Sequence, residues 1–464
     1  MTSVLNHLQR LNGNKLLIFC LIISGISSCA SKKISSSSNV EVVAIDTKRT
    51  ETSTTSGSTK NRYEDSVSKK PVVFDLDNNS IQNNTSNYNP STYTEPAKIL
   101  NTDPNRVHNI AVILPFYLDQ IPLGQYADDT TKQLGTDSKN AMEFYLGCQM
   151  AREKFESKQL KTNVYFLDDR NDSLTTTSLF NMKPFPNVDY IVGPLYFKNL
   201  KLASDLAKNN QIPLISPLAN SMYINNNPYY FNASASLKSQ YTYILETVKS
   251  KYPKKTLEVL FDAQDSTAES IDILKSLAGN YGYGEIKYTP LKLSEDVAAA
   301  LRQSDTTSER VVLIYSSKDT YIKSIIAKLK PIKNHLQIFT SSCAKNIKAL
   351  TDTKNPHTVY SVYPFNTDNP NYSVFAAKYE DKYKKKPSEY SNQGYDIMLY
   401  LFYLLDKNQH LQDNIFNYTA DFYNTQSRFR IKPVLNKNGN VDYYDNTFLY
   451  LYKYVNGTFI IATP

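Results

Sequence analysis

The chain lacks tryptophan, is poor in glycine and cysteine, and has no hydrophobic run long enough to cross a membrane. Its 464 residues include no Trp, 13 Gly and 4 Cys. Four cysteines cannot make a disulfide framework in a chain of this length, and so few glycines exclude collagen-like or glycine-rich low-complexity structure. The longest apolar run, residues 16–23, is far shorter than the ~20 residues that a membrane helix needs.

What is present is typical of a globular protein. Hydrophobic residues make up 41% and charged residues 21%, so a sizeable core is expected. The formal net charge is +8, but no basic run is interleaved with stacking aromatic residues as a nucleic-acid groove requires. The densest basic run, Lys384–Lys386, is interpreted as a solvated helix end. We therefore predict no nucleic-acid partner.

The N-terminus is typical of a bacterial lipoprotein. Arg10 and Lys15 precede the apolar run 16–23, as in a signal peptide. The following Ile26-Ser27-Ser28-Cys29 is similar to a lipobox, which implies a signal peptide of residues 1–28 and acylation of Cys29. The alternative is ordinary cleavage with an incidental cysteine. A lipid on Cys29 would anchor a chain that does not span the membrane, and Ala30 after the cysteine favours the outer membrane.

Residues 29–105 are predicted to be a disordered tether. They are dominated by Ser, Thr, Asn and charged residues, with only short apolar clusters. Such a segment cannot bury enough apolar surface to offset the entropy lost on ordering.

From residue 106 onward, the sequence alternates between strands and helices. Near-continuous apolar runs such as 110–114 are typical of buried parallel strands, and apolar residues at helical spacing follow them. Two successive sets of these units predict an α/β fold with two doubly wound, Rossmann-like lobes. Ligands of such sheets bind beyond the carboxyl ends of the strands.

Several segments together resemble the type I periplasmic binding protein fold, in particular the leucine-binding family of branched-chain amino-acid receptors. The segments that carry the resemblance are residues 110–115, 168–169, 190–194, 212–219, 375–387 and 394–399. The resemblance covers residues 106–464 and implies two lobes with three crossovers that close on a small ligand. It places lobe one at 106–232 and 364–424, and lobe two at 233–363 and 425–464.

The resemblance also locates a ligand cleft. Asp168 ends a strand, where an acid either contacts a ligand or caps the next helix. Ser216, Ala219 and Asn220 lie where the fold places the cleft, or else make a turn. The full set of predicted ligand-binding residues is Ser216, Ala219, Asn220, Tyr117, Tyr196, Asp168, Ser341 and Tyr363.

The chain departs from amino-acid receptors of the family at positions that contact the ligand. The family's serine after the strand that ends in Gly193 is replaced by the loop 195–198, where Tyr196 carries the hydroxyl. The family's ammonium-binding acid in lobe two has no counterpart in 341–344. The resemblance therefore favours the fold more strongly than it favours recognition of a free amino acid.

No catalytic motif, cofactor site or metal-ligand spacing is present, so we predict a binding protein and not an enzyme. Two functions remain. The first is a solute-binding lipoprotein of the cell envelope that faces the periplasm, takes an amino acid or peptide-like ligand and serves an ABC permease. The second is a non-transporting protein that resembles outer-membrane lipoprotein activators of penicillin-binding proteins and contacts a peptidoglycan synthase.

Overall fold

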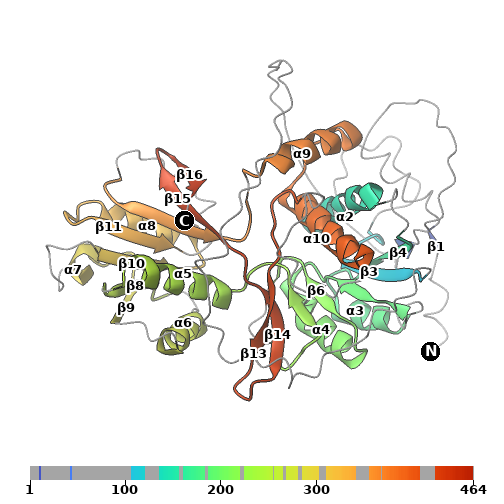
Figure 1. The fold of residues 1–464 in the computed structure, drawn as a ribbon, viewed down its shortest axis with the longest axis horizontal. Coiled ribbons are helices and arrows are strands. Elements are labelled where there is room, and N and C mark those ends of the chain that lie inside the picture. Colours follow the sequence, from blue (N-terminus) through green and yellow to red (C-terminus); the bar gives the residue numbers. More distant parts are fainter. Residues whose placement is uncertain are drawn as a thin grey trace.

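The computed structural model describes residues 10–11, 42–43, 106–120, 135–155, 160–182, 187–219, 224–253, 255–264, 268–280, 285–301, 310–340, 355–366, 368–407 and 424–462. Two lobes lie side by side, each built on one sheet (Figure 1). Cys29 and almost all of the predicted signal peptide and tether lie outside the described residues. The four described residues of that region form two short strands, β1 (Arg10–Leu11) and β2 (Val42–Val43).

The first sheet has nine strands in the order β1-β2-β4-β3-β5-β6-β7-β14-β13. Its strands beyond β1 and β2 are β3 (His108–Leu114), β4 (Thr162–Asp168), β5 (Tyr190–Val192), β6 (Leu214–Ser216), β7 (Tyr230–Asn232), β13 (Ile431–Leu435) and β14 (Val441–Asn446). Strands β3 to β7 and β14 pair in parallel, and β13 is antiparallel to β14. This is the doubly wound arrangement that the sequence predicts.

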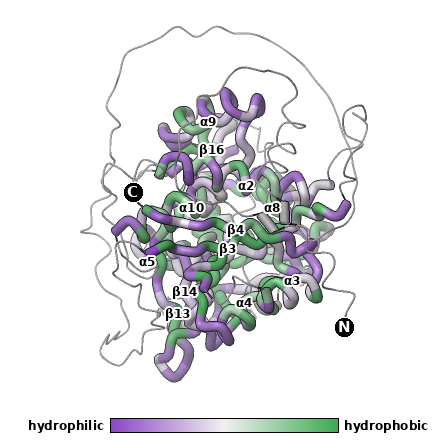
Figure 2. The backbone as a smooth tube through the Cα atoms, turned by 90° about the vertical axis from the view of Figure 1, so that its right-hand side faces the viewer, coloured by the Kyte–Doolittle hydropathy of each residue, from purple (hydrophilic) through white to green (hydrophobic). Residues whose placement is uncertain are grey.

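Alternate residues of β3 face two separate cores of the first lobe. Ile110, Val112 and Leu114 pack toward α2 (Thr136–Phe155) and α10 (Glu389–Asp406). Ala111 and Ile113 pack toward α3 (Ser173–Phe180) and α4 (Leu200–Asn209). Because both faces are covered, residues 110–114 of the strand are all apolar. In Figure 2 the region around β3 and β4 is largely hydrophobic, whereas the tip of the β13–β14 hairpin is hydrophilic.

The second sheet has seven strands in the order β16-β15-β12-β11-β10-β8-β9. The strands are β8 (Leu257–Asp262), β9 (Ile286–Leu291), β10 (Arg310–Tyr315), β11 (Leu336–Thr340), β12 (Thr358–Tyr363), β15 (Tyr450–Val455) and β16 (Thr458–Ile461). Strands β8 to β12 are parallel, and the hairpin β15–β16 joins β12 in antiparallel orientation. The Asn456-Gly457 dipeptide between two apolar runs predicts this hairpin, and the pairing of β15 with β16 confirms it.

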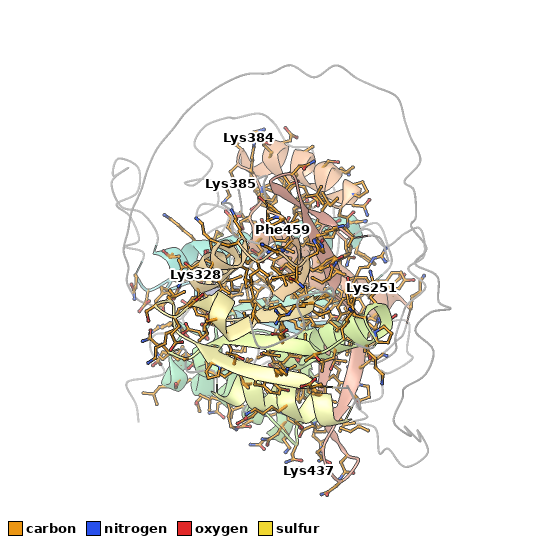
Figure 3. The ribbon with its side chains drawn as sticks, turned by 90° about the vertical axis from the view of Figure 1, so that its left-hand side faces the viewer. Lys251, Lys328, Lys384, Lys385, Lys437 and Phe459 are labelled. Atoms are coloured by element: carbon orange, nitrogen blue, oxygen red, sulfur yellow. The ribbon has the colours of Figure 1, made fainter. Side chains whose placement is uncertain are left out.

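Helices cover both faces of the second sheet as well. One face packs on α5 (Leu237–Lys251) and α6 (Ala268–Asn280), and the other packs on α7 (Val297–Leu301) and α8 (Asp319–Leu329). In Figure 3 the labelled Phe459 of β16 lies among the side chains of this lobe. Of the labelled lysines, Lys384 and Lys385 lie next to each other, whereas Lys251, Lys328 and Lys437 lie at separate places around the molecule.

The third crossing between the lobes lies later in the chain than the sequence predicts. The assignment of 425–464 to lobe two is wrong for β13 and β14, because β14 pairs with β7 of the first sheet. The rings of Phe231 and Tyr444 stack there with centroids 4.5 Å apart. The chain therefore enters the second lobe between Asn446 and Tyr450, and the other two crossings follow β7 and β12, as predicted.

Candidate functional site

Asp168 organises the edge of the first sheet where its parallel strands end. The side chain is fully buried, and its carboxylate accepts backbone N–H bonds from Tyr117 (3.1 Å), Leu118 (2.8 Å) and Arg170 (3.0 Å). Burial raises the pKa of Asp168 to about 6 against the effect of these bonds. Backbone N–H groups of the loops after β3 and β4 bind both carboxylate oxygens. Asp168 therefore holds these two loops together at the edge of the sheet rather than presenting an oxygen to a ligand.

Tyr117 is held at this edge in a left-handed backbone conformation, with φ 51°. Residues with a side chain adopt this conformation only when the surroundings fix it, and here the bond to Asp168 does so. The side chain is half-buried. Burial, followed by the charges of Asp137, Asp169 and Asp168, raises the pKa of its hydroxyl.

Tyr196 follows β5 through the Gly193-Pro194 turn. Gly193 has φ 112°, and a Cβ atom there would overlap the carbonyl oxygen of Ile113 in β3, so only glycine fits. The half-buried Tyr196 hydroxyl accepts a bond of 2.8 Å from Asn140 Nδ2 in α2. Burial raises its pKa, and Asp137 contributes in the same direction. The tyrosine therefore ties the loop after β5 to the first turns of α2.

The loop after β6 does not present the hydroxyl that the sequence suggested. Ser216 is fully buried, and its Oγ donates to the carbonyl oxygen of Ala219, which is turn chemistry. Ala219 is half-buried and packs toward α3 and α4. Leu218 packs both against the α2–α10 core of the first lobe and against a cluster of Tyr363, Phe365 and Tyr452. Asn220 lies outside the described residues.

Tyr363 joins the two lobes. It ends β12 of the second sheet, is buried, and donates from its hydroxyl to Glu389 Oε1 over 3.4 Å. Glu389 begins α10, where Ser388 and Ser391 form a reciprocal capping box. Burial raises the pKa of Glu389, and the Tyr363 bond opposes that effect. The ends of β12 and α10 therefore meet directly.

The sequence reasoning missed Glu389 and its neighbour Tyr390. Burial raises the pKa of Tyr390, and the charges of Glu389 and Asp137 raise it further, so both acids lie near this ring. The Ser388-x-x-Ser391 cap was the available signal, because a serine three residues before a second polar side chain marks a helix start.

The second lobe contributes a polar group at the matching edge of its own sheet. Ser316 is buried after β10, and its Oγ accepts the backbone N–H of Lys318 at 3.0 Å. Lys318 Nζ lies 3.1 Å from Asp262 Oδ2 at the end of β8. Ser341, predicted for this wall, lies outside the described residues. Three pairs thus come together in the first lobe and at its junction with the second: Tyr117 with Asp168, Tyr196 with Tyr390 through their side chains, and Tyr363 with Glu389.

A family model described as periplasmic binding protein matches residues 131–413, which is more than half of the chain. The chain belongs to the periplasmic binding protein family. No curated protein sequence matches it.

Solved structures of periplasmic binding proteins share this fold at low sequence identity. A proposed branched-chain amino-acid ABC transporter protein from Rhodospirillum rubrum is 12% identical, with a TM-score of 0.56, and the match covers 77% of this chain and 100% of that one. An ABC transporter substrate-binding protein from Desulfitobacterium hafniense is also 12% identical, with a TM-score of 0.50 and the same coverage. The predicted type I fold is confirmed.

Full-length LpoA from Haemophilus influenzae shares the fold over part of its length. It is 15% identical with a TM-score of 0.50, and the match covers 77% of this chain and 59% of LpoA. The chain thus spans little more than half of LpoA.

Two buried aspartates hold the crossings of this periplasmic binding protein fold. Asp396 of α10 accepts backbone N–H bonds from Thr425 (2.6 Å), Gln426 (3.0 Å) and Ser427 (2.8 Å). Ser427 in turn pairs with Phe365 just after β12. The resemblance of the 394–396 motif to the family therefore corresponds here to a structural role: Asp396 positions the segment beside the second crossing.

Asp445 of β14 plays the corresponding role at the first and third crossings. Its carboxylate accepts bonds from Asn232 Nδ2 (3.1 Å), the backbone N–H of Ser236 (3.2 Å), and the hydroxyls of Ser236 and Ser239. Ser236 caps α5 of the second lobe. Asn446 Nδ2 adds a bond of 2.8 Å to the carbonyl oxygen of Ala233. One polar network thus links the first lobe to the start of the second.

Within the described part of the chain, no group of three or more His, Cys, Asp or Glu side chains could hold a metal ion. No helix in the described residues is long and apolar enough to cross a membrane. Cys148 is buried in the α2–α10 core with a raised pKa due to burial, as expected for an unreactive thiol.

Proposed function

We propose that this protein is a membrane-anchored solute-binding lipoprotein that closes its two lobes around a small amino-acid or peptide-like ligand. The contact between Tyr363 and Glu389 carries the proposal. It brings the carboxyl end of a second-lobe strand to the first turn of a first-lobe helix, beside Leu218. Ligands of parallel sheets bind at such strand ends.

The hinge geometry supports closure. Three crossings connect the lobes, and buried carboxylates hold the backbone at each of them: Asp396 acts beside the second crossing, and Asp445 acts beside the first and third. Hinge closure of two compact cores uses a few residues at such crossings to absorb the change in backbone dihedrals.

The anchor in this proposal is a lipid on Cys29, which is supported by the lipobox-like Ile26-Ser27-Ser28-Cys29. The residue after the cysteine favours the outer membrane, with the body facing the periplasm. An ABC permease is the proposed partner for delivery of the ligand.

A thermal-shift screen of the purified full chain against amino acids, short peptides and muropeptides tests ligand binding. A hit is then measured by isothermal titration with Tyr363→Phe, which keeps the ring and removes the hydroxyl contact to Glu389. Tyr360→Phe on the same strand is the control, because Tyr360 stacks on Phe339 away from Glu389. The proposal predicts weaker binding for Tyr363→Phe alone. Wild-type affinity in both variants would place the ligand elsewhere.

The second candidate is a non-transporting protein that contacts a peptidoglycan synthase. Two exposed apolar side chains on the first lobe favour it: Leu174 in α3 is 80% exposed, and Phe197 in the short helix η4 (Phe197–Asn199) is 53% exposed. A bond of 2.9 Å between Ser173 and Asn199 holds these two elements together. Exposed apolar side chains grouped on a surface suit protein contacts.

A pull-down with peptidoglycan synthases separates the two candidates. Under the second candidate, Leu174→Ser with Phe197→Ser abolishes capture, whereas Tyr363→Phe leaves it unchanged. Capture that survives the double change would argue against this surface.

A further inference from the structure

Strand β16 is the outermost strand of the second sheet, beyond β15 (Figure 1), and it differs from the other described strands at a sheet edge. Strand β9 carries Pro290, and β13 carries Pro433 beside a register shift; both also carry a lysine. Strand β1 has only two residues. Proline and lysine on an edge strand hinder pairing with another chain. Strand β16, Thr458-Phe459-Ile460-Ile461, has no proline and no charge.

The register of β16 against β15 defines which of its backbone groups point outward. Ala462 donates its N–H to the carbonyl oxygen of Leu451 at 2.8 Å, and hydrogen-bonded pairs alternate with non-bonded pairs along an antiparallel ladder. The backbone N–H and C=O groups of Phe459 and Ile461 therefore face away from β15, toward a side on which no described strand lies. Each of these two residues offers one donor and one acceptor to an incoming strand.

The two faces of β16 carry different side chains. Phe459 and Ile461 are half-buried on one face, where Phe459 packs against Tyr454 with ring centroids 5.3 Å apart. Ile460 lies on the other face, is 48% exposed, and is paired with Lys453 of β15. Side chains of neighbouring strands meet along each face. An incoming strand therefore continues an apolar row on one face and a row that contains a cation on the other.

Lys453 is the only charged side chain of the β15–β16 hairpin. Residues 450–461 contain no acid and no second cation. Lys453 is half-buried, and its ammonium makes no ion pair within the described part of the chain. Opposite charges on neighbouring positions of one face stabilise strand pairing, whereas like charges destabilise it. The hairpin therefore favours an acidic incoming strand over a basic one.

A second copy of this chain fits the β16 edge less well. Strand β16 has four residues, and two such strands bury far less than the ~1,200–2,000 Å² of a stable interface. A second β16 also brings no acid to Lys453. An extended peptide segment needs less area, because main-chain hydrogen bonds hold it and its alternate side chains select it.

We propose that the β16 edge is a docking site for an extended, acidic segment of a partner protein, which adds to the second sheet as a further strand. The apolar residues of the segment lie beside Phe459 and Ile461, and its acidic residues lie on the face of Ile460 and Lys453. The segment thus alternates between apolar and acidic residues. This contact is separate from solute binding between the lobes and from the exposed surface of α3 and η4.

Synthetic peptides of matched pattern test the charge requirement. Fluorescein-labelled Val-Glu-Val-Glu-Ile-Glu-Val-amide is compared with Val-Lys-Val-Lys-Ile-Lys-Val-amide by fluorescence anisotropy with the purified full chain. The two peptides share their apolar residues and differ in the sign of their charge. The proposal predicts that the acidic peptide binds and that the basic peptide binds at least about tenfold more weakly.

Backbone methylation tests whether the peptide binds as a strand. One version of the acidic peptide carries N-methyl groups on its glutamate amides, and another carries them on the amides of its apolar residues. Only one of these alternate sets faces β16 in a ladder. One version is therefore expected to lose binding and the other to keep it.

Ile460→Glu tests the site itself, because it places an acid on the exposed face beside Lys453 and repels the acidic peptide. Val374→Glu is the matched control, since Val374 is 59% exposed on α9 (Pro370–Tyr383) of the first lobe. Both variants should melt near the wild-type temperature. Ile460→Glu is expected to weaken binding of the acidic peptide at least about tenfold, whereas Val374→Glu should bind it as wild type does.

Several results would overturn the proposal. They are the absence of binding by the acidic peptide, equal binding of the acidic and basic peptides, equal binding of the two methylated versions, and unchanged binding by Ile460→Glu. Sedimentation velocity of the full chain tests the competing occupant. A wild-type dimer that Ile460→Glu dissociates would assign the edge to a second copy and would likewise overturn the proposal.

Discussion

Gly394 in α10 packs directly against the backbone of Phe144 in α2. A Cβ atom added to Gly394 would overlap the Phe144 carbonyl oxygen, and one added to Gly147 would overlap the carbonyl oxygen of Ser391. The Cys148 thiol donates to the carbonyl oxygen of Gly394 at 3.5 Å. Gly147 and Gly394 thus allow the backbones of α2 and α10 to come into contact. This contact fixes the position of the first turn of α10, which carries Glu389 and Tyr390, at the candidate site.

The first prediction concerns this helix contact. Gly394→Ala is expected to destabilise the protein by about 1–3 kcal/mol, because the added methyl group must push the helices apart. Gly279→Ala in α6 is the control, since a Cβ there meets no atom within 4 Å and alanine favours helix. Urea unfolding measures both. Equal midpoints for Gly394→Ala and wild type would show that the helices do not pack this closely.

The sequence predicted the elements whose signals are local. The strand 110–114 is apolar along its length because both faces are buried, and the Asn456-Gly457 turn marks the last hairpin. Strands β13 and β14 carry weaker signals: Pro433 interrupts one, and Asp442 and Asp445 lie in the other. Their place in the first sheet depends on pairing with β7, more than 200 residues earlier, and no local pattern encodes that.

The candidate site was predictable only in outline. Strand ends pointed to the edge where the candidate site lies, and Tyr117, Tyr196 and Tyr363 were named from it. The sequence left open whether Ser216 contacts a ligand or makes a turn, and the structure shows the turn. The sequence could not show that backbone N–H groups bind both carboxylate oxygens of Asp168. Glu389 escaped notice because its position depends on how α10 packs on α2.

The second prediction concerns the hinge network. Asp445→Asn replaces an acceptor oxygen by an amide N–H2 facing the donors Asn232, Ser236 and Ser239. Donors left without an acceptor cost about 1–3 kcal/mol, so the free energy of unfolding should fall by roughly that amount. Asp205→Asn serves as the control, because Asp205 is an exposed partner of Lys201 and such pairs contribute little. Equal losses in the two variants would argue against the network.

The third prediction concerns the pH dependence of the same residue. Burial raises the pKa of Asp445 to about 6 in the folded protein, against about 3.9 in an unfolded chain. The folded state then binds the proton more tightly, so the contribution of Asp445 to stability is present below pH ~4 and is lost as the pH rises toward 6. The stability of wild type relative to Asp445→Asn should therefore fall between pH 4 and 6.5. A rise over that interval would mean that the hydrogen bonds outweigh burial and lower the pKa.

The fourth prediction concerns the anchor. Cys29→Ala removes the thiol that would accept the lipid, so metabolic labelling with palmitate should give no labelled protein, and the chain should either keep its signal peptide or leave the membrane fraction. Ser28→Ala keeps a small residue before the cysteine and should be labelled normally. Label on Cys29→Ala would refute lipidation at this residue.

The most direct test of the account is the distance between the lobes with and without ligand. Spin labels at Lys201 in α4 and Lys323 in α8, both exposed, report that distance by double electron–electron resonance, with Cys343 replaced by serine and Cys148 buried. The account predicts that a compound that binds shifts the distance distribution to a single, narrower population, and that Tyr363→Phe requires more of the compound for the same shift. An unchanged distribution at saturating ligand would contradict closure of the two lobes around a solute.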